Sequence, residues 1–329
     1  MARFIFAPFW RFFYCSLKKR LKEGWKLIHI VATAESAGQA EALIAAGVDT
    51  LYIGGNRFGL RMPGHITLEE IGDITKFVHR QNRKVYTAVN GLMHNGHIEA
   101  LPEYLSSLEK AGVDAITAGD PGVIQLLKEM KLNLPYIYDA QTLVTSANQI
   151  KFWLKRGAIG AVAARECTFI ELKEIQAQIR QPVEVQVYGP TCIHHSKRRL
   201  LSNYTQFAHL DAGTTVRDRL SISEKKDREK QYPLFEDENG THIFSAEDIA
   251  LIRYLPDLYR AGLDTWKLDG ILAEGETFTD IAALYVRAKE AVLSGTFDAA
   301  RFSAELLQLQ PETRKLGTGF FLRQPDEVQ

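Results

Sequence analysis

Polar side chains with binding and acid–base chemistry follow short apolar runs at seven places in the chain. They are Asn56, Arg57, Arg61, Asn90, His94, Asp120, Asp139, Gln141, Thr142, Arg165, Glu166, Cys192, His194, His195, Lys267 and Asp269. Arginine binds carboxylate or phosphate groups through two parallel hydrogen bonds. The three arginines in this set therefore predict a small anionic ligand.

Two functional groups are predicted from this set. The catalytic group is Asp139, Arg165, Glu166, Lys267 and Asp269, and the anion-binding group is Arg57, Arg61, Asn90 and Gln141. The alternative for each residue is a structural role, as a helix cap or an ion-pair partner.

Cys192 lies close to His194 and His195, which raises metal binding and nucleophilic catalysis as hypotheses. The spacing matches no standard zinc motif, so no metal site is predicted. A cysteine nucleophile needs a base against its sulfur, and nothing in the sequence places a histidine there. We therefore expect an inert thiol, and a packing role for Cys167. A chain with three cysteines excludes a disulfide framework and a four-cysteine cluster.

A basic segment follows Cys192. Residues 191–230 hold nine Lys and Arg against five Asp and Glu, with Tyr204 and Phe207 interleaved. Cations beside aromatic rings suit contact with an RNA backbone and its bases. We predict that Lys197, Arg198 and Arg199 bind RNA, and the alternative is an ordinary solvated loop.

The elements that position these residues follow one repeated pattern, in which a glycine ends a helical stretch and a buried strand follows. Gly47, Gly112 and Gly262 each stand in an Ala-Gly-Val/Leu-Asp motif, and Gly157 stands in a looser copy. Glycine takes the left-handed conformation that stops a helix at little cost.

Eight strands are expected, over residues 27–32, 50–53, 84–89, 115–118, 135–138, 161–164, 183–188 and 265–268. Helical segments separate most of them, which predicts an α/β fold: a (β/α)8 TIM-like barrel. A doubly wound open sheet is the alternative, but the G-x-G-x-x-G fingerprint of dinucleotide folds is missing. Barrels of this kind carry their active sites at the carboxyl ends of the strands, where the polar residues converge.

The regular pattern breaks between the seventh and eighth strands, where about 75 residues intervene, far more than one helix needs. Asn239-Gly240 predicts a β-hairpin, and Ser245 predicts the cap of a helix that begins at Ala246. The expected organisation is a leader (1–26), a first barrel part (27–190), a basic insertion with a hairpin (191–245), a second barrel part (246–295) and a C-terminal tail (296–329) that packs on the outside or on a partner.

Composition excludes several classes of protein. Forty Lys and Arg balance forty Asp and Glu, so a uniformly basic nucleic-acid coat is excluded. No apolar run is long enough to span a membrane. Residues 1–26 put their basic run after the apolar part, unlike a signal peptide, and we interpret them as a translated leader before a start near Leu27. A cytoplasmic protein is expected.

Several motifs together resemble one known family. The stretch Val187-Tyr-Gly-Pro-Thr-Cys192-Ile-His-His-Ser196-Lys-Arg-Arg-Leu-Leu-Ser-Asn-Tyr204 is similar to the signature of peptidase family U32. The motifs YIGGNRFGLR (ending at Arg61), KVYTAVN (ending at Asn90), FEDENGTH (235–242) and KLDG (267–270) fit as well. The resemblance runs from about residue 27 to residue 321.

The resemblance implies either of two activities. The family name implies a protease, including collagenase-like enzymes. Better-supported members are hydroxylation proteins that act on the wobble uridine of tRNA, on a ribosomal RNA cytidine or on ubiquinone precursors. Several carry an iron–sulfur cluster on four cysteines, and the RNA-acting members depend on prephenate. The sequence is most similar to the shorter Gram-positive tRNA hydroxylation proteins, which form 5-hydroxyuridine and occur as related pairs.

One departure from the family pattern affects the cofactor. Cys192 keeps the first cysteine position of the family motif, Arg199 occupies the second, and no cysteine follows Cys192. Cys192 is thus a lone remnant of the cluster motif, and we expect no cofactor bound by this chain alone. The resemblance implies prephenate, a small dicarboxylate, as co-substrate, and an iron–sulfur cluster on a paralogous partner.

Three functions stay open at this point. The first is a component of prephenate-dependent wobble-uridine hydroxylation, with tRNA as a partner and with a U32 paralogue or a second copy in the assembly. The second is a peptidase, although the sequence shows no serine elbow, no H-E-x-x-H and no ordered Cys–His pair. The third is a non-catalytic subunit that stabilises a cluster-bearing paralogue.

Overall fold

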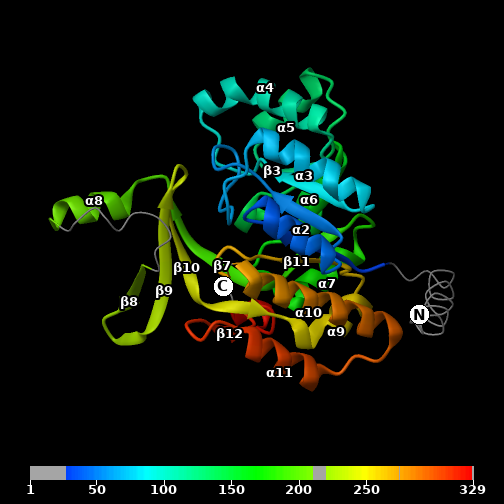
Figure 1. Ribbon diagram of the computed structural model, residues 1–329, viewed down its shortest axis with the longest axis vertical. Helices are drawn as coiled ribbons and strands as arrows, with labels where there is room; N and C mark the ends of the chain where they lie inside the picture. Colours follow the sequence, from blue (N-terminus) through cyan, green and yellow to red (C-terminus); the bar gives the residue numbers. More distant parts are fainter. Residues whose placement is uncertain (1–26, 210–219, 274, 328–329) are drawn as a thin grey trace, which may run out of the picture.

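The chain folds around a closed parallel barrel. The computed structural model describes residues 27–209, 220–273 and 275–327, so the expected leader lies outside the described residues. The barrel strands are β1 (His29–Thr33), β2 (Thr50–Ile53), β3 (Lys84–Ala88), β4 (Ala115–Ala118), β5 (Tyr136–Tyr138), β6 (Ala158–Val162), β7 (Val183–Ser196) and β11 (Thr265–Leu268). Each pairs with the next, and β11 closes the ring by pairing with both β7 and β1. The closure confirms the predicted (β/α)8 barrel and excludes the open sheet (Figure 1).

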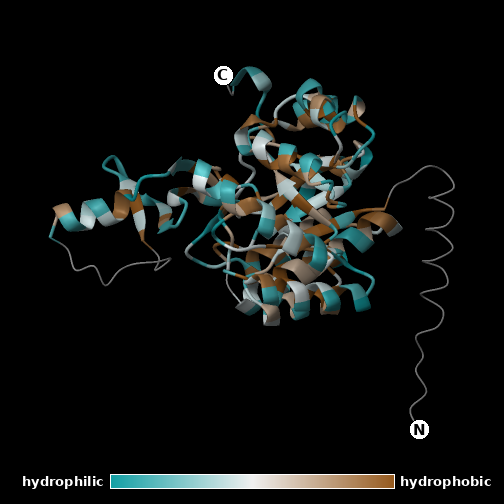
Figure 2. Cartoon of the chain, turned by 90° about the horizontal axis from the view of Figure 1, so that it is seen from above, coloured by the Kyte–Doolittle hydropathy of each residue, from teal (hydrophilic) through white to brown (hydrophobic). Residues whose placement is uncertain are grey.

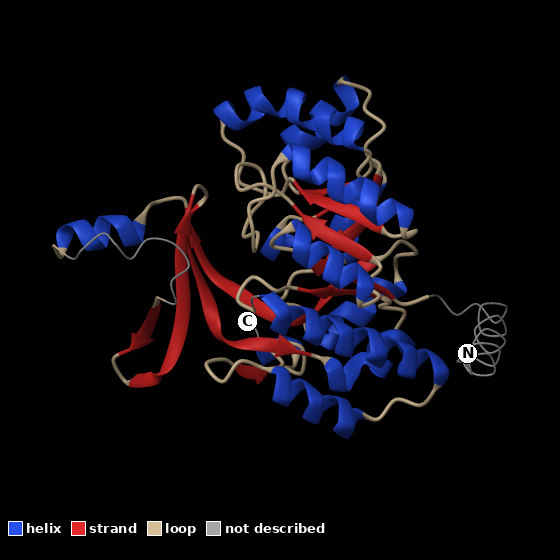
Figure 3. Ribbon diagram, in the orientation of Figure 1, coloured by secondary structure: helices blue, strands red, loops and turns tan. Residues whose placement is uncertain are grey.

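Helices cover the outside of the barrel (Figure 3). They are α2 (Ala37–Ala45), α3 (Leu68–Arg80), α4 (Asn95–Ala111), α5 (Pro121–Glu129), α6 (Ala147–Leu154), α7 (Phe169–Ala177), α9 (Leu255–Arg260), α10 (Gly275–Ser294) and α11 (Ala299–Leu309), with 3-10 turns η1 (Gln141–Leu143), η2 (Ile252–Tyr254) and η3 (Pro325–Glu327). The predicted glycine stops are confirmed, because Gly47, Gly112, Gly157 and Gly262 all have positive φ between 77° and 103°. A side chain there would be strained.

An arm leaves the barrel at its seventh strand. β7 runs well beyond the predicted end at residue 188, and its second half pairs antiparallel with β10 (Gly240–Ala250). The arm also holds α8 (Leu200–Phe207), β8 (Ser221–Glu224) and β9 (Asp227–Asp237). It stands out from the barrel and mixes hydrophilic with hydrophobic residues (Figure 2).

The hairpin predicted at Asn239-Gly240 joins β9 to β10. Gly240 has a φ of 111°, and a Cβ there would lie 2.0 Å from the carbonyl oxygen of Ser196. Only glycine fits this turn, because both the backbone conformation and the close approach exclude a side chain.

The helix predicted from Ala246 is wrong. β10 continues to Ala250, with Asp248 opposite Pro190 of β7 and Glu247 opposite Lys315 of β12 (Lys315–Gly317). Hydrogen bonding to strands distant in the sequence outweighs the local capping signal at Ser245. The sixth strand also begins three residues before its predicted start, because the run 158–164 is apolar throughout and carries no boundary signal.

The tail after Gly295 packs against the barrel. The guanidinium of Arg314 holds the carboxylate of Asp248 on β10 through bonds of 3.1 Å from Nε, and both side chains are buried. Gln310 bridges the same carboxylate and the hydroxyl of Tyr188 at 2.8 Å each. The tail therefore fastens the strand on which the arm returns to the barrel.

A candidate active site at the mouth of the barrel

Asp139 forms the centre of a buried polar cluster at the carboxyl ends of the strands. Nδ2 of Asn90 donates to Oδ2 of Asp139 at 2.6 Å. The backbone N and Nε2 of Gln141 donate to the other oxygen at 3.2 and 2.9 Å. Oδ1 of Asn90 accepts the backbone N–H of Leu60, so the cluster also fixes the loop after β2. Its hydrogen bonds give Asp139 the geometry of an orienting group.

Arg61 and Gln141 are joined in an unusual way. Nη2 of Arg61 donates to Oε1 of Gln141, and both residues have a left-handed φ of 56°. Non-glycine residues in that region are strained, and such strain concentrates at functional sites. Burial lowers the pKa of the Arg61 guanidinium, and the charge of Arg165 acts in the same direction, while Cys192, Asp139 and Asp269 oppose them. Arg61 thus lies within electrostatic range of most of the mouth.

Arg165 belongs to a second group at the same end. Its Nη2 lies 3.8 Å from Oδ2 of Asp269, and its Nε donates to Oε1 of Gln186. Gln186 in turn donates to the carbonyl oxygen of Pro190 at 3.1 Å, where β7 leaves the barrel. The two arginines therefore stand on neighbouring polar supports, which suits an anion with more than one charged group.

Lys267 lies deeper than predicted. Its Nζ is 3.6 Å from Oε1 of Glu184 and 3.8 Å from the centre of the Tyr52 ring, and the lysine is 4% exposed. Tyr52 shares a 2.8 Å hydrogen bond with Thr117. Burial raises the pKa of Glu184, and attraction to Lys267 only partly opposes this. These residues form a polar floor under the mouth, inside the barrel.

Not every predicted residue joins the cluster. Arg57 is exposed beside Phe58, with its guanidinium 5.3 Å from that ring. Glu166 is half-buried and takes no part in the hydrogen bonds that surround Asp139 in the described part of the chain. Lys197, Arg198 and Arg199 lie exposed on the arm, and Nζ of Lys197 donates to the carbonyl of Glu238 at 3.0 Å. The functional roles of all these residues stay predictions.

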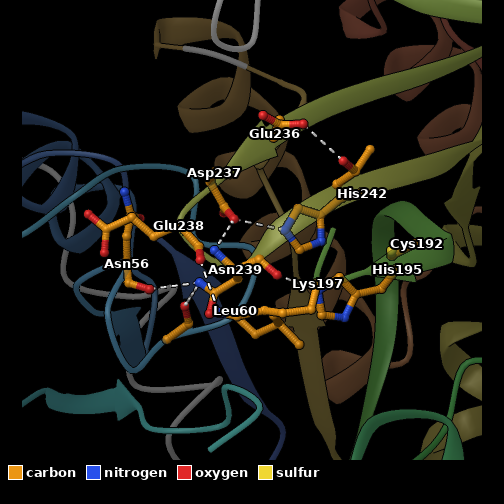
Figure 4. Close-up of polar contacts among 12 residues, drawn as sticks. Asn56, Leu60, Cys192, His195, Lys197, Glu236, Asp237, Glu238, Asn239 and His242 are labelled. Carbon is orange, nitrogen blue, oxygen red and sulfur yellow. Dashed lines mark hydrogen bonds and ion pairs between the residues drawn. The ribbon is translucent and has the colours of Figure 1, made fainter. Parts of the chain in front are cut away.

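The root of the arm, where β7 and β10 leave the barrel and β9 pairs with β10, brings His242 and Asp237 to Cys192. The sequence did not predict this arrangement. Nε2 of His242 lies 3.0 Å from Oδ1 of Asp237, and Nδ1 of the same ring is buried without a hydrogen-bond partner among the described residues. The Cys192 thiol donates to the carbonyl oxygen of His194 and acts on the imidazole electrostatically. His242 is fully buried and stacks on His195, with ring centres 4.5 Å apart. Figure 4 shows Asp237 pointing at the His242 ring.

The pKa shifts of this group are mutually consistent. Burial acts to raise the pKa of the Cys192 thiol, but His242 and Arg61 outweigh it, and the net shift is downward. Burial acts to lower the pKa of His242, but Asp237 and Cys192 outweigh it, and the net shift is upward. A thiolate next to an imidazolium is the activated form of a cysteine nucleophile. The sequence places no histidine against Cys192, because His242 is distant along the chain, and whether the thiol is inert stays a prediction.

The hairpin turn ties this group to the barrel. Nδ2 of Asn239 donates to the carbonyl oxygens of Asn56 at 2.7 Å and Gly59 at 3.2 Å, both in the loop that carries Arg61. Nε2 of His195 lies 2.9 Å from the carbonyl oxygen of Asn239. Figure 4 shows the turn reaching the loop after β2. The arm root is thus held against the mouth by buried hydrogen bonds.

The sequence did contain a signal for two of the site residues that were not predicted, Glu184 and Gln186. Glu184 and Gln186 alternate with valines in an otherwise apolar strand, and a polar residue at every second position of a buried strand points into the barrel. For His242 and Asp237 the signal is the FEDENGTH hairpin itself, which lies 40 or more residues from Cys192. Only the register of β10 on β7, with Phe244 opposite Cys192, brings them together.

The surroundings of Cys192 do not fit a four-thiolate cluster. Its polar neighbours are an imidazole and a guanidinium, and the described residues contain no group of three His, Cys, Asp or Glu able to hold a metal ion. The other described cysteine, Cys167, is buried with its thiol directed to the carbonyl oxygen of Val144. A cluster site would need thiolates that this environment does not offer.

One cavity lies away from the mouth of the barrel. A cavity of about 430 Å³ opens at the opposite end of the barrel, among residues such as His29, Tyr86 and Glu184. That end of such a barrel serves stability, so the mouth remains the candidate site.

Among the described residues, no helix combines the length and the apolar character that crossing a membrane requires.

Comparison with known proteins agrees with the motifs. The model of peptidase family U32 matches residues 35–329. The tRNA hydroxylation protein P2 of Bacillus subtilis is 33% identical, over 90% of this chain and 97% of its own length. The tRNA hydroxylation protein P1 of the same organism is 25% identical over 78% of this chain, and the match spans 61% of P1. A 23S rRNA 5-hydroxycytidine synthase of Escherichia coli is 24% identical over 84% of this chain and 41% of its own length. This chain therefore belongs to peptidase family U32.

Proposed function

We propose that this protein is a component of prephenate-dependent hydroxylation of the tRNA wobble uridine, which forms 5-hydroxyuridine in the cytoplasm. The relatives named as tRNA hydroxylation proteins and as an rRNA 5-hydroxycytidine synthase support an RNA substrate. The observation that carries the proposal is the mouth, where Arg61, fixed in a strained conformation by Gln141, stands near Arg165. Two arginines at one mouth suit a dicarboxylate such as prephenate.

The same observations support two kinds of partner, a tRNA and a second protein chain. We propose that the exposed cations of the arm contact tRNA, and that a U32 paralogue or a second copy of this chain completes the assembly. An iron–sulfur cluster, where the pathway uses one, belongs to the paralogue, because the surroundings of Cys192 here do not supply four thiolates.

The test measures 5-hydroxyuridine by mass spectrometry in tRNA from strains that lack this gene, its nearest paralogue or both. We expect the modification to fall in one of these strains and to return with the wild-type gene. Arg61→Ala and Arg165→Ala are expected to fail to restore it while the protein and its assembly persist. Arg80→Ala, an exposed arginine on α3, is the matched control and is expected to restore it. Normal 5-hydroxyuridine in every strain contradicts the proposal.

The same experiment separates catalysis from scaffolding. If Arg61→Ala and Arg165→Ala restore the modification as well as the wild type does, the mouth is not used and the chain serves as a non-catalytic subunit.

A second candidate, a cysteine-type peptidase, is favoured by one observation, the Cys192–His242–Asp237 arrangement. Such a trio activates a thiol for attack on a peptide carbonyl. The test is cleavage of denatured collagen by repurified protein, compared with Cys192→Ala. Cleavage that survives purification and is lost in the variant supports the peptidase.

A further inference from the structure

We propose that Cys192 is a nucleophile that adds to C6 of the target uracil ring and thereby activates C5. The inference rests on the proposed function, since it assigns a step to hydroxylation at C5 of a pyrimidine. It assigns Cys192, His242 and Asp237 the roles of nucleophile, proton carrier and orienting carboxylate. The mouth arginine Arg61 is assigned to charge stabilisation.

The geometry fits a working trio more closely than a packing arrangement. His242 is fully buried, held on one side by Asp237 at 3.0 Å and on its face by the His195 ring at 4.5 Å. Its ring orientation is therefore fixed, as the base of a nucleophilic pair requires, and its second nitrogen, Nδ1, is buried without a hydrogen-bond partner in the described part of the chain. Cys192 is half-buried, with Sγ 3.2 Å from the carbonyl oxygen of His194, and it interacts electrostatically with Arg61 of the mouth.

The chemistry of the pyrimidine explains the need for such a thiolate. The C5=C6 double bond of uracil is conjugated with the C4 carbonyl, so a nucleophile adds at C6 and the π pair moves to C5 and O4. The Cys192 sulfur forms the S–C6 bond, and negative charge develops on the exocyclic oxygen O4. Arg61, which lies within electrostatic range of Cys192, is placed to stabilise that charge.

The step is reversible and needs no oxidant. The His242 imidazolium supplies a proton to C5, and the neutral imidazole then removes either proton from the same carbon. The pair that held that proton re-forms C5=C6, and the thiolate leaves C6. The net result is exchange of the C5 hydrogen with solvent, and the addition makes C5 electron-rich.

The arm favours a nucleic acid over a peptide as the partner of this thiolate. Lys197, Arg198 and Arg199 follow the Cys192 strand directly and are exposed. Cations on the same arm bind the phosphates on either side of a base that enters the mouth. An anticodon base is single-stranded, so it reaches a pocket without the cost of opening a duplex.

The experiment follows hydrogen exchange at C5 in heavy water. The full chain is mixed with its nearest paralogue and with unmodified tRNA from the double-deletion strain, without prephenate. Deuterium at C5 of the wobble uridine is read by nucleoside mass spectrometry. We expect the wild type to exchange this hydrogen. Cys192→Ser and Cys192→Ala are expected to slow it by at least about 100-fold, the usual scale for losing a catalytic group.

Two controls separate chemistry from folding. Cys167→Ser removes a buried thiol outside the trio and is expected to exchange at the wild-type rate. Wild-type protein alkylated at Cys192 is expected to lose exchange without any change of sequence. His242→Gln, which keeps a polar side chain, is expected to slow exchange while tRNA binding persists.

The outcomes distinguish this inference from the proposed function. Exchange at the wild-type rate in Cys192→Ala overturns the inference, as does an absence of exchange in wild-type protein that restores 5-hydroxyuridine in cells. In both cases the proposed function survives. If the wild-type protein shows no exchange and its gene does not restore the modification in cells, the proposed function is wrong. The inference, which rests on it, is then wrong as well. Collagen cleavage that depends on Cys192, without exchange, assigns the thiolate to a peptide and also overturns it.

Discussion

At the scale of single residues, the two described cysteines differ by environment alone. Burial raises the pKa of the Cys167 thiol to about 12, with the carboxylates of Glu171 and Glu166 acting in the same direction. Cys192 is also partly buried, yet His242 and Arg61 bring its pKa below the ordinary value. We therefore expect the Cys192 thiol to be the more reactive of the two, because the thiolate is the reactive form.

This difference predicts the order of alkylation. At neutral pH we expect iodoacetamide to modify Cys192 at least about tenfold faster than Cys167, because the reactive form is the thiolate. Peptide mass mapping over time measures the two rates. In denaturant the two rates are expected to converge, and equal slow rates in the folded protein would contradict the assignment.

Asp237 is predicted to control the thiol through His242. Asp237→Asn removes the charge that raises the pKa of His242, so this pKa falls and the imidazole loses its proton at lower pH. The pKa of Cys192 then rises, and its alkylation at neutral pH slows. The pH profile of alkylation measures this, with Asp227→Asn at the far, exposed end of β9 as the control. An unchanged profile in Asp237→Asn would show that the carboxylate does not act on the pair.

Protonation of His242 stabilises the folded protein, and the direction of its pKa shift sets how this stabilisation depends on pH. Its pKa is raised on folding, so the stabilisation is complete below its ordinary pKa of 6.5 and is lost as the pH rises through the folded value.

At the scale of elements, β10 is the strand that unites the arm, the barrel and the tail. It pairs with β7, β9 and β12, and its buried Asp248 binds Arg314. Local signals favoured a helix over part of it. A strand with partners on both edges satisfies its backbone through residues far away in the sequence, which local patterns do not report.

Loss of the buried ion pair between Arg314 and Asp248 is predicted to destabilise the folded protein. Arg314→Ala leaves the Asp248 carboxylate buried without its cation, and we expect it to lower the free energy of unfolding by about 3–5 kcal/mol. Arg301→Ala removes an exposed pair with Glu305 and should change it by at most about 1 kcal/mol. Urea denaturation of both variants measures the contrast. Equal small effects would show that the tail does not secure β10.

At the scale of the whole molecule, a closed barrel carries one arm beside its mouth (Figure 1). The turn of the arm is fastened to the loop of Arg61 by Asn239, while Tyr204 and Phe207 on α8 are 61% and 84% exposed. Exposed aromatic rings beside cations are suited to stacking on bases. Under the proposed function, the arm is the surface that binds the large substrate and the mouth is the site that takes its reacting group.

The arm is predicted to dominate the salt dependence of tRNA binding. Replacing Lys197, Arg198 and Arg199 together by alanine is expected to weaken binding and to reduce the slope of log K against log salt by about 3 units, one for each lost phosphate contact. Filter binding at several salt concentrations measures this. Lys128→Ala with Lys131→Ala, exposed around the end of α5, is the control, and an equal effect there would place the RNA elsewhere.

The sequence by itself determined the eight barrel strands, the glycine stops, the hairpin and the end of the barrel that holds the polar residues. Those features depend on periodicity and on backbone preferences within a few residues. The tertiary structure alone decided that β10 is a strand, that Lys267 lies below the mouth, and that Arg57 stands outside it. It also decided that His242 and Asp237 meet Cys192. These outcomes depend on strand register and barrel closure, which join residues by hydrogen bonds across long stretches of chain, and no local pattern carries that information.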